Sequence, residues 1–93
     1  MPQLTLARIR ALVRALNYVV SIHAADELQD DSLSILDLEN IVLTGRIIER
    51  QRDRQTREAK VLIRGRTLDG SAAETVVKVS SSGTLFFITI YLV

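Results

Sequence analysis

The sequence has no cysteine and no tryptophan, and only one histidine, one proline and four aromatic residues, two of them tyrosine and two phenylalanine. Without cysteine the chain forms no disulfide and no thiolate zinc site, and a metal ion would depend on carboxylates beside the single His23. Phosphate loops, nucleophile elbows and dinucleotide fingerprints are also absent, because the glycines are isolated. We therefore expect no metal and no cofactor.

Long hydrophobic runs are missing as well. Apolar stretches such as Ile88 to Val93 are far too short to span a bilayer, and no charged n-region is followed by an apolar h-region and a cleavage site. With 93 residues, 47% hydrophobic and 25% charged, the composition is ordinary for one globular domain, here residues 1–93. We expect a soluble, unprocessed, cytoplasmic protein.

Helical spacing of apolar residues dominates the first half of the chain. Leu6, Ile9, Val13 and Leu16 predict an amphipathic helix over Leu4–Leu16 within residues 1–17, with Pro2 near its start. Residues 18–45 form a second helical part. It comprises an extended lead-in over Tyr18–Ile22, a helix over His23–Leu28 with Ser21 as its cap, and a helix over Ile35–Leu43 with a Ser34/Asp37 capping box and Gly45 after its end.

The period changes to two from residue 46, which predicts a sheet over 46–93. Turn residues separate four strands, at about Ile47–Arg52, Glu58–Thr67, Glu74–Ser80 and Thr84–Leu92. The fourth is apolar on both faces, so we expect it to be central. The predicted fold class is α+β, with N-terminal helices packed on one face of a four-stranded antiparallel β-meander.

Positive charge is concentrated in the middle of the chain. Residues 46–66 hold eight basic and three acidic groups, a net charge of +5, whereas the whole chain has a net charge of +1. If Val61 and Ile63 pack on the helices, the strand alternation predicts an open face carrying Lys60, Arg64, Arg66, Lys78, Thr89 and Tyr91 around apolar Leu62 and Phe87. Such a face suits a phosphate backbone with a base stacked on an aromatic ring. The alternative is a solvated face whose long side chains cover hydrophobic residues.

His23 permits three interpretations. At a helix start it could serve as a general acid or base, since its unperturbed pKa lies near neutrality. It could instead have a structural role, bonding the backbone where the strand meets the helix. Its spacing to Asp26 and Glu27 also permits a metal site, although one histidine with two surface acids is a weak signal.

Five segments in order carry a family resemblance, across about residues 18–92. They are Ser21-Ile22-His23-Ala24, Asp37-Leu38-Glu39, Leu43 to Glu49, Lys60 to Thr67, and Leu85 to Tyr91. The chain resembles a family of small, mostly bacterial proteins known as domain of unknown function 4258. Members of that family are similar to RelE-type and BrnT-type toxins of toxin–antitoxin systems, which are ribosome-dependent or free messenger-RNA interferases with a RelE-like fold.

The resemblance implies a set of site residues. The histidine of the family's "HA" signature is His23, its basic strand positions are Lys60 and Arg64, and its terminal "IT-Y" pair is Thr89 and Tyr91. Many members have an arginine shortly after "HA", where this chain has Asp26 and Glu27. The implied catalytic residues are His23, Lys60, Arg64 and Tyr91, and the implied binding residues are Arg57, Arg66, Lys78 and Thr89.

Three functions follow as expectations. The first is a metal-independent endoribonuclease toxin acting on RNA, with a cognate antitoxin as its protein partner and no membrane partner. The second is a non-catalytic module whose cationic face binds nucleic acid or an acidic protein segment. The third is a structural protein that self-associates through its first helix.

Overall fold

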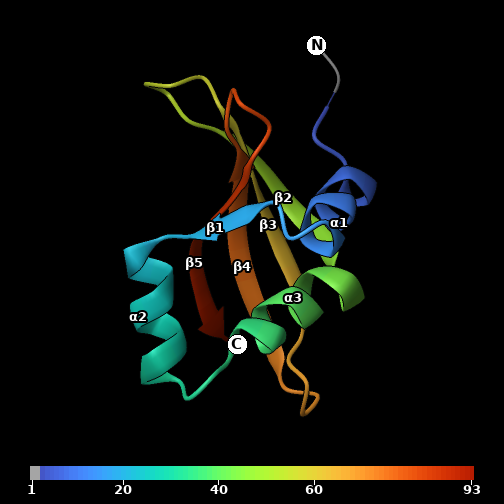
Figure 1. Cartoon of the computed structure of the whole chain (residues 1–93), viewed down its shortest axis with the longest axis vertical. Helices are drawn as coiled ribbons and strands as arrows, with labels where there is room; N and C mark the ends of the chain where they lie inside the picture. The colour runs from blue at the N-terminus through green and yellow to red at the C-terminus, as the bar shows by residue number, and fades with distance from the viewer. Residues whose placement is uncertain (1–2) are drawn as a thin grey trace.

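The computed structural model describes residues 3–93, which form three helices and a five-stranded sheet (Figure 1). Helix α1 spans Leu6–Arg14, slightly shorter than expected, and starts where the Thr5 hydroxyl accepts a hydrogen bond from the Arg8 N–H at 3.1 Å. Pro2, predicted near the helix start, lies outside the described residues. Ile9 and Val13 form the buried side of α1, as their spacing predicted.

The two following helices begin at the predicted caps. Helix α2 spans Ile22–Asp30, and the Ser21 hydroxyl accepts a hydrogen bond from the Ala24 N–H. Helix α3 spans Ile35–Thr44 and starts with the complete Ser34/Asp37 capping box. Both helices run one or two residues further than predicted, because the terminal turns lack the apolar spacing from which the bounds were predicted.

The sheet contains one strand more than the predicted meander. The strands are β1 (Tyr18–Val20), β2 (Arg46–Arg52), β3 (Ala59–Arg66), β4 (Ala72–Val79) and β5 (Leu85–Leu92), in the spatial order β1-β5-β4-β3-β2. The extended lead-in before α2 is β1, which pairs in parallel with β5. The prediction of a purely antiparallel four-stranded sheet was therefore wrong. A meander leaves one backbone edge of β5 unpaired, and β1 covers the first half of that edge.

Helices cover one face of the sheet. Helices α1 and α3 lie over it in Figure 1, and α2 runs beside β5. The core between these layers contains Ile9, Val13, Leu38, Ile41, Val42, Val61, Ile63, Val77, Leu85, Phe87 and Ile90. The opposite face has no helix over it in the described part of the chain. We call it the open face and define it by Lys60, Leu62, Arg64 and Arg66 of β3, Glu74, Val76 and Lys78 of β4, and Phe86, Thr89 and Tyr91 of β5.

A β-bulge in β5 corrects one predicted member of the open face. Strict alternation places Phe87 on the same side as Thr89 and Tyr91, but Phe87 is fully buried under the helices. The register between β4 and β5 shifts between Val76 and Val77. Val76 pairs with Thr89 and Val77 pairs with Phe87, so Ile88 is the extra, unpaired residue. The bulge returns Ile90 to the core, and Phe86, not Phe87, lies on the same face as Thr89 and Tyr91.

Two glycines set the close approach between α3 and β3. A Cβ on Gly65 would lie 2.1 Å from the Ile41 carbonyl oxygen, and one on Gly45 would lie 2.5 Å from the same oxygen and 2.6 Å from the Arg64 carbonyl oxygen. Gly45 has an extended backbone with φ of −91°, so the close contact is the reason for glycine there. The end of α3 is thereby fixed against the part of β3 that carries Arg64 and Arg66.

Candidate functional site

Strand register arranges the open face in three rows across β3, β4 and β5. The rows are Lys60, Lys78 and Phe86; Leu62, Val76 and Thr89; and Arg64, Glu74 and Tyr91. Arg66 follows at the end of β3, opposite Ala72. Six of the eight predicted site residues therefore share one surface, and the two others, His23 on α2 and Arg57 between β2 and β3, lie at its edge.

The third row is a hydrogen-bonded network centred on Glu74. The Arg64 guanidinium donates to Glu74 Oε2 through Nε at 2.7 Å and approaches it through Nη2 at 2.5 Å, while the Tyr91 hydroxyl donates to Oε1 at 2.6 Å. Only 8% of the Glu74 side chain is exposed, against 48% for Arg64. Both carboxylate oxygens are thus occupied inside the sheet surface.

This network shifts the ionisation of both acids. The hydrogen bond from Tyr91, followed by Arg64, lowers the pKa of Glu74 against the opposing effect of burial. The same bond to Glu74, followed by burial, raises the pKa of Tyr91. Tyr91 therefore stays protonated at neutral pH, where it can donate a proton or a hydrogen bond but cannot serve as a general base.

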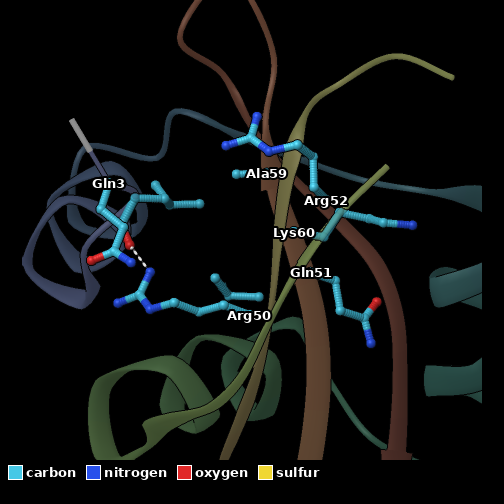
Figure 2. A pocket seen from close by; sticks show the side chains of 8 residues that line it. Gln3, Arg50, Gln51, Arg52, Ala59 and Lys60 are labelled. Carbon is cyan, nitrogen blue, oxygen red and sulfur yellow. Dashed lines mark hydrogen bonds between the residues drawn. The ribbon is translucent and has the colours of Figure 1, made fainter. Parts of the chain in front are cut away.

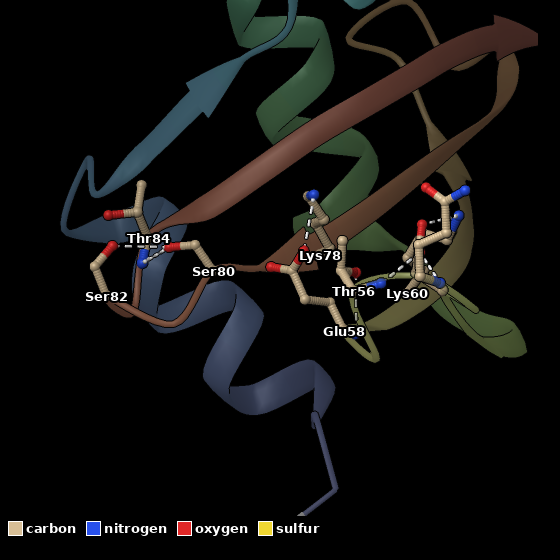
Figure 3. Close-up of polar contacts among 9 residues, drawn as sticks. Thr56, Glu58, Lys60, Lys78, Ser80, Ser82 and Thr84 are labelled. Atoms are coloured by element: carbon tan, nitrogen blue, oxygen red, sulfur yellow. Dashed lines mark hydrogen bonds and ion pairs between the residues drawn. The ribbon is translucent and has the colours of Figure 1, made fainter.

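The two lysines of the first row are each near an acid from the chain between β2 and β3. Lys78 Nζ lies 3.1 Å from Glu58 Oε1, and Figure 3 shows the two side chains pointing toward one another. Lys60 Nζ lies 3.6 Å from Asp53 Oδ2, and Lys78 also sits 5.9 Å from the centre of the Phe86 ring. About a quarter to a third of each of these side chains is exposed, and ion pairs in contact with water are weak, so an anionic ligand can compete with them.

His23 lies at the edge of the open face, on α2. Its Nε2 is 3.4 Å from Glu27 Oε1, and the same oxygen accepts hydrogen bonds from the Thr89 hydroxyl at 2.5 Å and the Ile90 N–H at 2.9 Å. Glu27 thus caps the part of the β5 edge that β1 leaves uncovered. His23 is joined to Thr89 through this carboxylate, and 71% of its side chain is exposed.

Arg57 is set apart from the three rows. It lies between β2 and β3 with a positive φ of 65°, and its N–H donates to the Asp53 carbonyl. Its carbonyl accepts a hydrogen bond from the Arg52 side chain at 2.6 Å. The position is exposed and can contribute charge to a ligand only from the edge of the face.

Arg46 of β2 extends the open face, because it pairs with Arg64, although the sequence did not single it out. It is the first residue of β2 and stands directly opposite Arg64. Arg46, Arg64 and Arg66 line a pocket of about 210 Å³ together with Thr44, Gly65 and Ala72. The signal in the sequence was the basic residue immediately after Gly45, which becomes informative only once β2 is paired with β3.

A larger pocket of about 470 Å³ lies toward the turn end of the β2–β3 hairpin, where Arg52 pairs with Ala59. Its lining residues are Gln3, Leu4, Arg50, Gln51, Arg52, Ala59, Lys60 and Val61. Figure 2 shows Arg50 and Arg52 on one side of the hairpin, with Gln51 and Lys60 pointing to the other. Arg50 donates to the Leu4 carbonyl at 2.5 Å, which ties the segment before α1 to the sheet.

Residues 3–93 contain neither a group of metal-ligating side chains nor a helix that could cross a bilayer. Within that range no three His, Asp or Glu side chains are grouped so that they could hold a metal ion, His23, Asp26 and Glu27 included. None of the helices there is both long enough and apolar enough to cross a bilayer.

Comparison with known proteins identifies a family. No curated protein and no solved structure matches the chain. The family described as Domain of unknown function (DUF4258) matches residues 20–92, which include α2, α3 and β2 to β5. Because the match covers most of the 93 residues, the chain belongs to the DUF4258 family.

Proposed function

We propose that this protein is an RNA-directed, toxin-like protein of bacterial toxin–antitoxin type, with a RelE-like arrangement, that acts in the cytoplasm as a metal-independent endoribonuclease. The observation that carries the proposal is the open face. It presents Lys60, Lys78, Arg64 and Arg66 on adjacent strands, with the exposed or half-buried rings of Phe86 and Tyr91 between and beside them.

This surface has the two features that single-stranded RNA requires. Lysine and arginine side chains pair with backbone phosphates, and flat rings stack with unpaired bases. Lys60 and Arg64 are four residues apart on one strand, about 13 Å at the rise of an extended chain. An RNA strand lying across β3, β4 and β5 can therefore contact more than one cation.

Cleavage needs three kinds of group around one phosphate. A base removes the proton from the RNA 2′-hydroxyl, whose oxygen bonds to the adjacent phosphorus. The bond from phosphorus to the 5′-oxygen breaks, and an acid protonates that oxygen, leaving a 2′,3′-cyclic phosphate. We assign the base to His23 and the acid to Tyr91, which its raised pKa keeps protonated. Arg64 stabilises the phosphorane charge, and Lys60, about 13 Å along the strand, holds a neighbouring phosphate.

A non-catalytic module is the second candidate, and one observation favours it. Lys60, Lys78 and Arg64 already lie beside Asp53, Glu58 and Glu74, so the face also accommodates carboxylates. An acidic segment of an antitoxin or other protein could replace Asp53 and Glu58, the two partly exposed acids. In that case His23 has no chemical role, and only the cations affect binding.

The test is incubation of the purified protein with a long unstructured RNA in EDTA. We expect wild type to cleave the RNA and both His23→Ala and Arg64→Ala to lose cleavage. Arg14→Ala removes an exposed cation from the end of α1 and serves as the matched control. Intact RNA whose gel mobility is retarded, with the retardation relieved by Arg64→Ala alone, would replace the enzyme with the binding module. Unretarded, intact RNA would contradict both.

A further inference from the structure

The pocket formed by Arg46, Arg64 and Arg66 has an unusual concentration of one charge. Arg46 and Arg64 are directly opposite each other on neighbouring antiparallel strands, an arrangement that normally destabilises a sheet when the charges are alike. Arg66 follows two residues along on the same face as Arg64. All three are exposed, and they surround one volume of about 210 Å³.

Intramolecular partners account for only part of this charge. Glu74 is the one carboxylate that forms an ion pair with these three arginines in residues 3–93, so two of the three guanidinium groups have no carboxylate partner. Glu49 of β2 lies on the same face, opposite Leu62, but forms no ion pair with them. Arg66 donates to the Gly70 carbonyl at 2.9 Å, which uses one of its donors and no opposing charge. The hydrogen bonds and ion pairs of the described residues include none made by the Arg46 side chain.

Helix capping does not explain Arg46 either. The carbonyl end of α3 carries a partial negative charge that a nearby arginine can stabilise. Arg10 of α1 fills that role, because its Nε donates to the Val42 carbonyl at 3.1 Å and its Nη2 to the Gly45 carbonyl at 2.8 Å. The charge of Arg46 is therefore available to a ligand.

We propose that this pocket is a phosphate-binding site, with Arg46 and Arg66 as its principal donors and Arg64 held in place by Glu74. A phosphate offers more acceptor oxygens than a carboxylate and pairs with guanidinium groups in a bidentate manner, so it satisfies several arginines at once. The identity of the ligand rests on the proposed function. If the protein binds RNA, the phosphate is either a backbone phosphodiester or the terminal phosphate of the strand.

Inorganic phosphate is the direct probe of the site. We would titrate it into ¹⁵N-labelled protein and follow the backbone amide signals, holding ionic strength constant with sodium chloride. The expected result is a saturable shift confined to residues around the pocket, such as Gly65, Arg66 and Ala72. Arg46→Ala should weaken the apparent affinity about tenfold or more, and Arg46→Lys should weaken it less.

Arg52→Ala is the matched control, because it removes an exposed arginine from the same strand that lines the other pocket. It should leave the phosphate shifts unchanged. The absence of saturable shifts, or equal losses in Arg46→Ala and Arg52→Ala, would overturn the site. Amide signals away from the pocket that match those of wild type would show that the Arg46→Ala protein is folded.

A second titration identifies the source of the phosphate. Matched RNA oligonucleotides with a 5′-phosphate and with a 5′-hydroxyl distinguish a terminal site, which binds only the first, from a backbone site, which binds both. Both outcomes support the phosphate site. Phosphate binding without any RNA binding would contradict the proposed function but support the phosphate site. RNA binding without phosphate shifts at the pocket would contradict the phosphate site but support the proposed function.

Discussion

Glu74 is the residue on which the open face depends most closely, since it holds both Arg64 and Tyr91 in position. Its pKa lies below the ordinary value of 4.5. A lowered folded-state pKa adds stability above the unfolded value, and that stability is lost as pH falls below 4.5 through the folded pKa. Removing the charge should therefore change how the protein responds to acid.

We predict that Glu74→Gln lowers the free energy of unfolding at pH 7 by about 1–3 kcal/mol, because Arg64 loses its charged partner. The variant should also lose less stability than wild type between pH 4.5 and 3. Urea denaturation across pH 3–7 measures both effects. Tyr91→Phe removes the hydrogen bond that lowers the pKa of Glu74 most, so its loss of stability between pH 4.5 and 3 should lie between those of wild type and Glu74→Gln. Parallel profiles for wild type and Glu74→Gln would contradict the assignment.

The period-two alternation of the sequence was sufficient to predict most basic residues of the open face. It grouped Lys60, Arg64 and Arg66 because β3 is regular throughout and alternates cleanly between buried and open positions. It could not show that Glu74 occupies the centre of the third row, because that depends on the pairing of three strands. Arg46 was missed for the same reason, since only the pairing of β2 with β3 brings it opposite Arg64.

At the scale of elements, the contact between α3 and β3 positions the phosphate pocket. The absence of a side chain at Gly65 lets the Ile41 carbonyl approach the strand. We predict that Gly65→Ala destabilises the protein by about 3 kcal/mol or more, because neither backbone segment can move without disturbing the core. Thermal and urea denaturation report this change directly.

Gly70→Ala is the comparison for that prediction. Gly70 has a φ of +89° and open space where a Cβ would lie. Its substitution should cost only about 1 kcal/mol, from the conformational preference of alanine. Equal losses in the two variants would mean that α3 is not held against β3 by close packing.

Helix starts that are encoded by neighbouring residues were predicted correctly. Strand features that depend on pairing with a distant segment were not. The caps of α2 and α3 are encoded within a few residues, and Ser21 and Ser34 fill them as expected. The strand identity of β1 depends on β5, more than sixty residues away. The bulge at Ile88 depends on register with β4, and without that register Phe87 was assigned to the wrong face.

At the scale of the whole molecule, the two edges of the sheet differ in protection and charge. On one side, the edge is formed by the short strand β1 and then by the second half of β5, where Glu27 of α2 accepts a hydrogen bond from the Ile90 N–H. The β2 side is an edge strand interrupted by a bulge at Ile48 and carrying Arg46, Arg50 and Arg52, devices that discourage pairing with another chain. The cationic middle of the sequence is therefore concentrated at one side of the sheet, beside an open face of mixed charge.

Salt dependence of RNA binding tests this distribution. Each phosphate neutralised on single-stranded RNA lowers the logarithm of the affinity by about 0.7 per tenfold increase in salt. With one phosphate in the arginine pocket and one each at Lys60 and Lys78, three phosphates are neutralised and we predict a slope of about −2, which fluorescence anisotropy of a labelled oligonucleotide can measure. Arg46→Ala should make the slope about 0.7 less steep, because one contact is lost. Arg14→Ala, whose cation lies on α1, should keep the wild-type slope. If Arg14→Ala changed the slope as much as Arg46→Ala, the attraction would come from net charge, and the cationic side of the sheet would have no special role.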